Sequence, residues 1–195
     1  MINKGMSFKK CKELIKKDSR RNGSVFVGLF KPLHALLIWF RLCGYFWSRN
    51  MHIMHLCTKV PFKVYQYITG VHLDERCSCG GGLHIEHHSN IAISVGATLG
   101  ENVTLFQGVT IGKNFGGSHG GYPNIGDNVI LFAGCKVLGK VRVGNNAVIG
   151  ANSVVTKDVP DNCVVAGVPA KVVSEDFRTA IFKNEYEKHF KLKGY

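Results

Sequence analysis

A repeat of six residues is the feature that most constrains how this chain can fold. Between residues 125 and 159, aliphatic residues recur every six positions, and a small or β-branched residue comes four positions after most of them. A period of six fits neither an α-helix nor the two-residue alternation of a strand. It predicts a chain that turns a corner every six residues, so that three faces close one triangular coil and stacked coils share one core. The aliphatic positions are Ile125, Leu131, Val137, Val143, Ile149 and Val155.

An earlier block keeps the same period and extends the predicted stack. Thirteen units in all predict about four coils of three faces each. A β-sandwich with evenly spaced strands is the alternative, but its spacing would be roughly 8–12 residues, which the strict period of six argues against. The earlier positions are Leu73, Cys79, Ile85, Ile91, Ala97, Val103 and Val109.

The segments around the repeats divide the chain into three parts. Residues 71–173 form the predicted coil domain, and a glycine-rich stretch, Lys113–Asn124, interrupts it as a loop that leaves the coil wall. Residues 1–70 are basic and mostly helical in pattern, with helices expected at Phe8–Lys17 and Leu33–Trp47. Residues 51–69 fit a third helix or an irregular connector. Residues 174–195 form a polar tail with a short helix.

Charge and cysteine content favour a cytoplasmic protein with an anionic neighbour. The net charge is +12, of which residues 1–66 contribute +11, with 13 Lys and Arg against 2 Asp and Glu. Seven cysteines without a regular framework suit a reducing compartment. The charged N-terminus has no signal-peptide pattern, and Val25–Trp47 is interrupted by charges and a proline, so it is not expected to span a bilayer.

The repeats, the glycine-rich loop and the block IGANSVVTKDVPDNCVVAGVPAKVV resemble the hexapeptide-repeat acyltransferases. Within that family the closest pattern is the serine O-acetyltransferase branch, with its relatives that acetylate sugars of capsules and exopolysaccharides. The resemblance implies a mainly β fold, a left-handed parallel β-helix behind an N-terminal α-helical segment. It also implies an O-acetyltransferase that uses acetyl-CoA as co-substrate, assembles as a homotrimer and needs no metal.

The resemblance places the catalytic histidine of the family at His87, directly after Glu86. A histidine suits this task because its pKa lies near working pH, so it can take the proton of a hydroxyl that attacks a thioester and pass it to the leaving thiolate. In the serine branch a carboxylate fifteen positions earlier pairs with this histidine. That position is His72 here, and Asp74 is the nearest acid. Which group orients the imidazole, with Glu86 and His72 as candidates, is left open.

The same resemblance implies the contacts of the coenzyme, which lies in a groove between neighbouring subunits. Small residues at coil corners, Ala133 and Ala151, match the positions that let the pantetheine arm approach. Gly167 and Lys171 of AGVPAKV match the end near the adenosine phosphates, where a cation is useful.

The acceptor is expected to contact Tyr122, Asp18 and His119. In the serine branch the loop ends in Arg-His-Pro, which binds the carboxylate of the amino acid, and here the triplet is Gly121-Tyr122-Pro123. An aromatic residue suits a sugar ring, so a carbohydrate hydroxyl is the favoured acceptor. Serine is the alternative, with Asp18 as the amine contact and another cation, such as Arg76, in place of the missing arginine.

Two other kinds of function compete with acetyl transfer. The ligand types for zinc occur at Cys77, Cys79, His84, His87 and His88, but Cys-x-Cys is not the usual spacing. The γ-type carbonic anhydrases share the coil fold and bind zinc through three histidines, yet His119 stands alone in the loop; His84 and His88 are therefore expected to be ordinary polar residues on a coil face. The basic N-terminal segment shows no nucleic-acid motif. It fits either a helix at the inner face of an anionic membrane or a solvated helix that packs on the coil.

Overall fold

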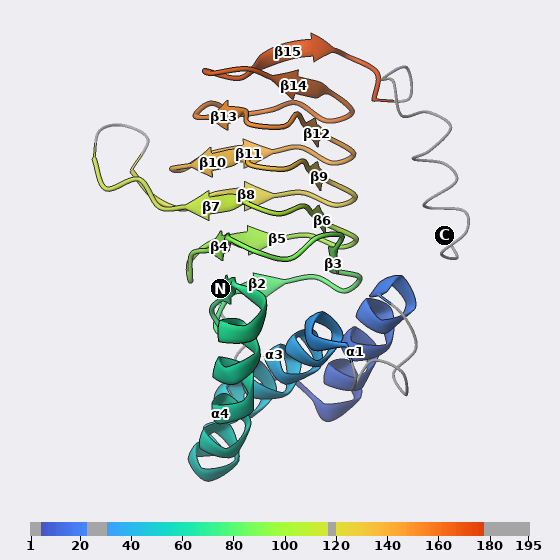
Figure 1. The fold of residues 1–195 in the computed structure, drawn as a ribbon, viewed down its shortest axis with the longest axis vertical. Helices are drawn as coiled ribbons and strands as arrows, with labels where there is room; N and C mark the ends of the chain where they lie inside the picture. The colour runs from blue at the N-terminus through green and yellow to red at the C-terminus, as the bar shows by residue number, and fades with distance from the viewer. Residues whose placement is uncertain (1–4, 23–30, 117–119, 178–195) are drawn as a thin grey trace.

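The computed structural model describes residues 5–22, 31–116 and 120–177. Three helices come first, and a stack of short parallel strands rises from them (Figure 1). This is the predicted fold, a parallel β-helix behind a helical segment. The stack has about five turns rather than the four expected from counting repeats.

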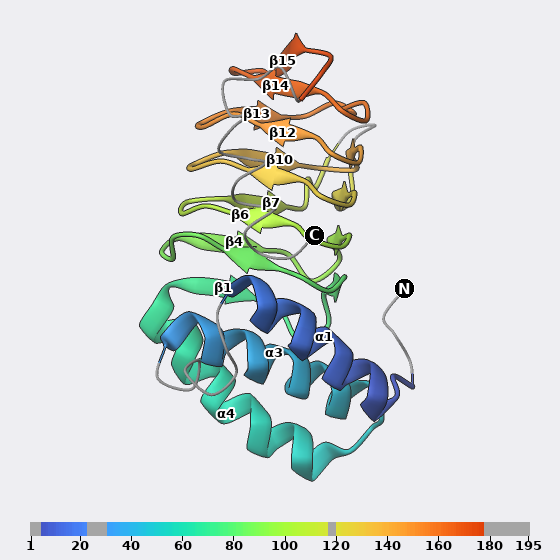
Figure 2. The ribbon, with the colours of Figure 1, turned by 90° about the vertical axis from the view of Figure 1, so that its right-hand side faces the viewer.

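The helices are α1 (Phe8–Asn22), α3 (Pro32–Ser48) and α4 (His52–Thr69). Pro32 occupies the first turn of α3, where its fixed φ suits a helix start, and Gly70 ends α4 in the left-handed conformation at φ 65°. The segment after residue 51 is therefore a helix and not an irregular connector, although Pro61 lies inside it. Helix α3 packs against both of the others and forms the middle of the helical layer (Figure 2). No described helix is long and apolar enough to cross a membrane.

Each of the first four coils contributes one strand to each of three sheets, and the fifth contributes one to the first sheet and one to the third. The first sheet has the order β1-β4-β7-β10-β13, the second β2-β5-β8-β11, and the third β3-β6-β9-β12-β14, with β15 added antiparallel to β14. The strands are β1 (Val71–Leu73), β2 (Ser78–Cys79), β3 (His84–Ile85), β4 (Ile91–Ile93), β5 (Thr98–Leu99), β6 (Thr104–Leu105), β7 (Thr110–Gly112), β8 (Asn124–Ile125), β9 (Ile130–Leu131), β10 (Lys136–Leu138), β11 (Arg142–Val143), β12 (Val148–Ile149), β13 (Val154–Val155), β14 (Val164–Ala166) and β15 (Lys171–Ser174).

Asparagines hold the corner between the second and third sheets. One asparagine from each of four successive coils takes a positive φ of 55–60°, a conformation that asparagine tolerates better than most residues. The side-chain amide of each one donates to the side-chain oxygen of the next, at 2.9–3.1 Å. This ladder satisfies polar groups along the corner and fixes the stacking of coils. Its members are Asn102, Asn128, Asn146 and Asn162.

The core of the β-helix is a column of buried aliphatic side chains, but it does not keep one period throughout. Strand pairing aligns Ile85 with Leu105 and Ile93 with Ile111. The step from Ile85 to Ile93 thus takes eight residues, where the step from Leu105 to Ile111 takes six. Two additional residues therefore widen the corner between β3 and β4. The period of six runs from Ile85 to Ile91, which is also buried, so the insertion does not show in the sequence pattern.

Candidate active site

His87 and three of the residues expected to contact the coenzyme lie along one edge of the β-helix, where the third sheet turns into the first. Backbone hydrogen bonds from Glu86, Phe106, Phe132 and Gly150 to the next coil stack the corners in register. The residues that directly follow these four are His87, Gln107, Ala133 and Ala151, and Gly167 takes the same place one coil later. We call this row the histidine edge. Its lower end carries the predicted base, and three of the four predicted coenzyme contacts lie above it.

His87 is exposed at the widened corner. Its ring lies 6.0 Å from the ring of Phe106, edge to face, and Phe106 lies 4.9 Å from Phe132. The corner returns to the first sheet through Ser89 and Asn90, which take φ values of 108° and 51°. An exposed imidazole beside an aromatic row is accessible to an acceptor and to an extended ligand lying along the edge.

Glu86 contacts a different histidine from the one that the sequence suggested. Its Oε2 lies 2.6 Å from Nε2 of His84, while Nδ1 of His84 donates to Oδ1 of Asn22 at 2.9 Å. His84 is therefore buried and bonded rather than an ordinary surface residue. His88 donates from Nδ1 to the carbonyl of Thr69 at 3.2 Å. His84 and His88 thus connect the first coil to α1 and α4.

His72 lies on the outer, exposed side of β1, in the first sheet. It lines a cavity of about 320 Å³ with Lys63 and Asp74. Asp74 is itself engaged, because Arg76 Nε and Nη2 donate to its two oxygens at 2.8 and 2.9 Å, and this contact lowers the pKa of Asp74.

A cavity of about 500 Å³ opens beside the base of the histidine edge, between α1, the start of α3 and β3. Its walls carry both signs of charge. This was not predicted, because the sequence pattern of the helices does not tell which of their residues face the coil. Glu86 supplies a carboxylate to this cavity. Its cationic and neutral polar lining residues are Arg20, Arg21, Lys31, Asn22, His34, His84 and His88.

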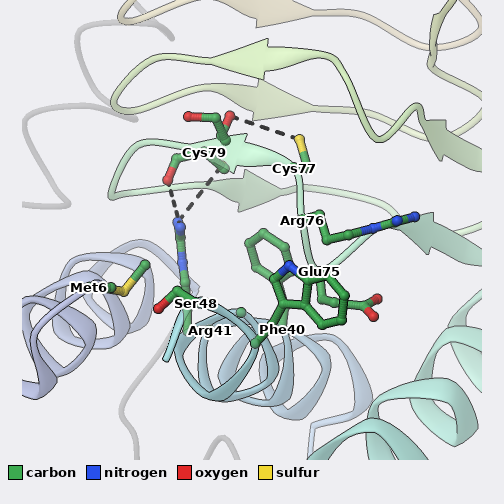
Figure 3. Close-up of a pocket in the computed structure, with 11 residues that line it drawn as sticks. Met6, Phe40, Arg41, Ser48, Glu75, Arg76, Cys77 and Cys79 are labelled. Carbon is green, nitrogen blue, oxygen red and sulfur yellow. Dashed lines mark hydrogen bonds between the residues drawn. The ribbon is translucent and has the colours of Figure 1, made fainter. Parts of the chain in front are cut away.

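Asp18 does not face this cavity. Its carboxylate is buried and receives Nε and Nη2 of Arg41, at 2.8 and 3.2 Å, and the backbone N–H groups of Gly82 and Leu83, at 2.8 and 3.0 Å. Arg41 reaches from α3 to the carbonyl of Cys79 (Figure 3). The expectation that Asp18 contacts a substrate amine does not fit this arrangement, because the carboxylate is buried and accepts from four donors inside the protein.

The predicted loop leaves a different edge, where the first sheet turns into the second. Asn114 and Gly121 pair at its base through two backbone hydrogen bonds of 3.1 and 3.0 Å. The ring of Tyr122 lies directly on the backbone of Gly96, and the ammonium of Lys113 lies 5.4 Å from that ring. His119 lies outside the described residues. Tyr122 and His87 of one chain therefore occupy separate edges.

The two remaining predicted cations lie far from each other. Arg76 lies on the turn between β1 and β2, at the same edge as the loop, and pairs with Asp74. Lys171 is exposed on β15 opposite Ala166, next to Gly167 at the upper end of the histidine edge. The contact of Lys171 with the coenzyme stays a prediction.

The zinc ligands suggested by sequence do not assemble among the described residues. The thiol of Cys77 donates to the carbonyl of Ala97 at 3.2 Å, Cys79 contacts Arg41, and His84 contacts Glu86. These side chains point to separate partners, so they do not form one coordination shell.

Comparison with known proteins agrees with the fold and the resemblance. Residues 122–157 match the family model described as bacterial transferase hexapeptide (six repeats). Serine acetyltransferase of Staphylococcus epidermidis is 34% identical over 152 residues, 76% of this chain and 68% of that protein. That of Staphylococcus aureus is 39% identical over 125 residues, 63% of this chain and 57% of that protein. The match thus spans little more than half of the S. aureus relative.

A solved structure described as serine acetyltransferase in complex with CoA superposes with a TM-score of 0.67 at 26% identity. The superposition covers 85% of this chain and 71% of that one. The chain therefore belongs to the hexapeptide-repeat transferase family, in its serine acetyltransferase branch.

Proposed function

We propose that this chain is an acetyl-CoA-dependent O-acetyltransferase whose acceptor is serine. The observation that carries the proposal is the exposed His87, which lies at the base of an edge of small residues and beside a cavity with both cations and a carboxylate. The serine acetyltransferase relatives and the CoA complex of a structural neighbour support it.

In the proposed reaction His87 acts as the general base. Its imidazole takes the proton of the serine hydroxyl while the oxygen attacks the thioester carbonyl of acetyl-CoA. The carbon–sulfur bond then breaks, and the protonated imidazole returns the proton to the departing thiolate, which gives O-acetylserine and CoA. An acetyl-CoA lying along the histidine edge would meet Ala133 and Ala151, whose small side chains allow close approach, and Lys171 near its phosphates.

Serine replaces the carbohydrate acceptor that the sequence of the loop favoured. The names of the relatives support the alternative, and the charges beside His87 support it independently. An amino acid needs a cation for its carboxylate and an anion for its ammonium group. Arg20 or Lys31 fits the first role and Glu86 the second. Tyr122, the main argument for a sugar, is itself engaged, because its ring packs on the backbone of Gly96.

A homotrimer fits the separation of the loop from His87. Three parallel coil stacks around one axis would bring the loop edge of one subunit to the histidine edge of its neighbour, so that each site is built from two chains. Light scattering tests this arrangement: a monomer that keeps full activity when dilute contradicts it.

Contact with an anionic membrane through the helical layer is also part of the proposal. The outer face of α4 exposes large apolar side chains, including Ile53, Leu56 and Tyr67 at 80%, 64% and 90% exposure, and α4 contains no acidic residue. The net charge of +11 in residues 1–66 would attract anionic lipid. Flotation with vesicles tests it: binding to neutral and anionic vesicles alike, or to neither, contradicts this contact.

The acceptor is tested by measuring acetyl-CoA turnover with serine, free sugars, nucleotide sugars and purified glycan in parallel. We expect turnover with serine at a KM in the range of roughly 1 µM–1 mM. Lys31→Met should raise the KM for serine and leave that for acetyl-CoA nearly unchanged, with Lys9→Met, an exposed lysine at the start of α1, as the matched control. Turnover with a sugar acceptor alone would overturn the assignment of serine.

A further inference from the structure

Three side chains of the kinds that bind transition metals converge at the junction of the helices with the first coil. Cys43 comes from α3, His55 from α4 and Glu75 from the turn after β1. Their ligand atoms all lie within 4.8 Å of one another. None of them belongs to the proposed acetyl-transfer site or to the zinc pattern that the sequence suggested.

One ring nitrogen of His55, Nε2, has no hydrogen-bond partner. Its Nε2 is buried and lies 3.4 Å from Oε1 of Glu75, without the geometry of a hydrogen bond. A buried polar atom without a partner is costly, so its persistence calls for an explanation. Nitrogen and oxygen ligands at about 2.0–2.1 Å from a tetrahedral zinc ion lie about 3.3 Å apart. The observed separation suits two ligands of one metal ion better than it suits a direct contact.

The other two proposed ligands already have partners: the Cys43 thiol carries its proton, and the Glu75 carboxylate pairs with the ammonium group of Lys59. Burial raises the pKa of the Cys43 thiol to about 11, so the thiol is protonated without a metal and would lose its proton to zinc. Burial also opposes ionisation of Glu75, but the hydrogen bond from Lys59, a backbone hydrogen bond and the charge of Lys59 together outweigh it, so the pKa of Glu75 is lowered. The Lys59 ammonium lies 2.8 Å from Oε1, and its side chain is 39% exposed. That exposure lets Lys59 move toward solvent when a metal takes its place.

We propose that Cys43, His55 and Glu75 form a zinc site, with a water molecule as the fourth ligand. One sulfur, one nitrogen and one oxygen donor suit zinc among common metals. Because the three ligands come from α3, α4 and the first coil, bound zinc would cross-link the helical layer to the β-helix. Gly44 allows this junction to close, since a Cβ there would lie 2.9 Å from the carbonyl oxygen of Glu75. The site stands apart from acetyl transfer and does not depend on it.

Metal titration of the full chain, stripped with a chelator, tests the site. Zinc affinity is measured by competition with a chromophoric chelator, and cobalt replaces zinc for spectroscopy. We expect one metal ion per chain, a cobalt–thiolate charge-transfer band and the intense visible bands of tetrahedral cobalt. Cys43→Ser should abolish the charge-transfer band and weaken zinc binding by at least about 100-fold, since losing even an outer partner of a ligand costs 10–100-fold.

His55→Gln gives a second variant that retains the thiol, and it should weaken binding comparably. Cys57→Ser, which removes an exposed thiol from the same helix as His55, is the control and should bind like the unaltered chain. Melting of the metal-free variants checks that each one folds. Absence of binding, binding that Cys43→Ser and His55→Gln leave unchanged, or loss of binding in Cys57→Ser would overturn the proposal.

Discussion

Replacing Asp18 by asparagine should destabilise the protein strongly without a specific effect on substrate binding. Asp18 and Arg41 are 2% and 4% exposed at their side chains, and four donors converge on the carboxylate. Asparagine keeps the shape, but it removes the counter-charge of a buried guanidinium and points an NH₂ group at donors. Breaking a buried ion pair from one side costs about 3–5 kcal/mol. For a chain of this length that predicts a fall in melting temperature of about 6–20 °C.

Urea unfolding and calorimetry measure this loss against a control on the same helix. Glu13→Gln removes an exposed ion pair with Lys10, at 3.3 Å and 48% exposure of both side chains, and should leave stability unchanged. Replacing Asp18 by leucine and Arg41 by methionine together should recover part of the loss, because no uncompensated charge then stays buried.

Steady-state kinetics separates this structural role from the amine contact expected from sequence. The folded fraction of Asp18→Asn should retain the KM for serine of the unaltered chain. An Asp18→Asn variant that unfolds like the Glu13→Gln control, yet raises the KM for serine tenfold or more, would refute the reasoning.

Three further predictions concern the base, the loop and acid stability. His87→Ala should lower kcat by about 10²–10⁴-fold with an unchanged melting temperature, since a positioned general base contributes that much; His88→Ala should do much less, and equal losses would contradict the assignment. Gly96→Ala should displace Tyr122, because a Cβ there lies 2.5 Å from the ring, and faster proteolysis within Lys113–Asn124 would report it. Burial lowers the pKa of His34 below its ordinary 6.5, so as the pH falls His34 is protonated in the unfolded chain before it is protonated in the folded one. Stability in urea should therefore fall as pH drops from about 6.5 through the folded pKa, and His34→Gln should remove that part of the pH dependence.

The repeat predicted the architecture because the period of six is imposed by the core itself. Every coil must bury an aliphatic residue on each face, so the pattern survives wherever the coil continues. The same rule hid the insertion at the widened corner. Each face buries two positions that lie two residues apart, such as Ile91 and Ile93, and both are aliphatic. A search for a period of six can therefore switch from one of these two buried positions to the other without an apparent break in the repeat.

The side-chain partners of the site could not be read from the sequence. The histidine edge was predictable, because corner positions repeat with the coil. Asp18 and Arg41 lie 23 residues apart, and Glu86 has histidines on both sides of it, so only the packing of α1 and α3 on the first coil decides who pairs with whom. Packing of the helices on the coil likewise decides that Arg20, near the end of α1, and Lys31, directly before α3, line the cavity.

The widened corner itself gives a last prediction, because the regular corners above it show what it would be without its insertion. Deleting His88 and Ser89 leaves Asn90 directly after His87, in the place that Asn152 takes two coils from the top, and both asparagines already have a positive φ, 51° and 56°. The N–H of Gly108, which now donates to the carbonyl of Ser89, would donate to that of His87, as Asn152 donates to Ala133. We therefore expect the shortened chain to melt within a few degrees of the unaltered one. His87 would lie in line with the small residues above it rather than at the wide corner, and a misplacement of about 1 Å can cost about 10²-fold in turnover. A shortened chain that folds and keeps full turnover would show that the insertion does not position the base.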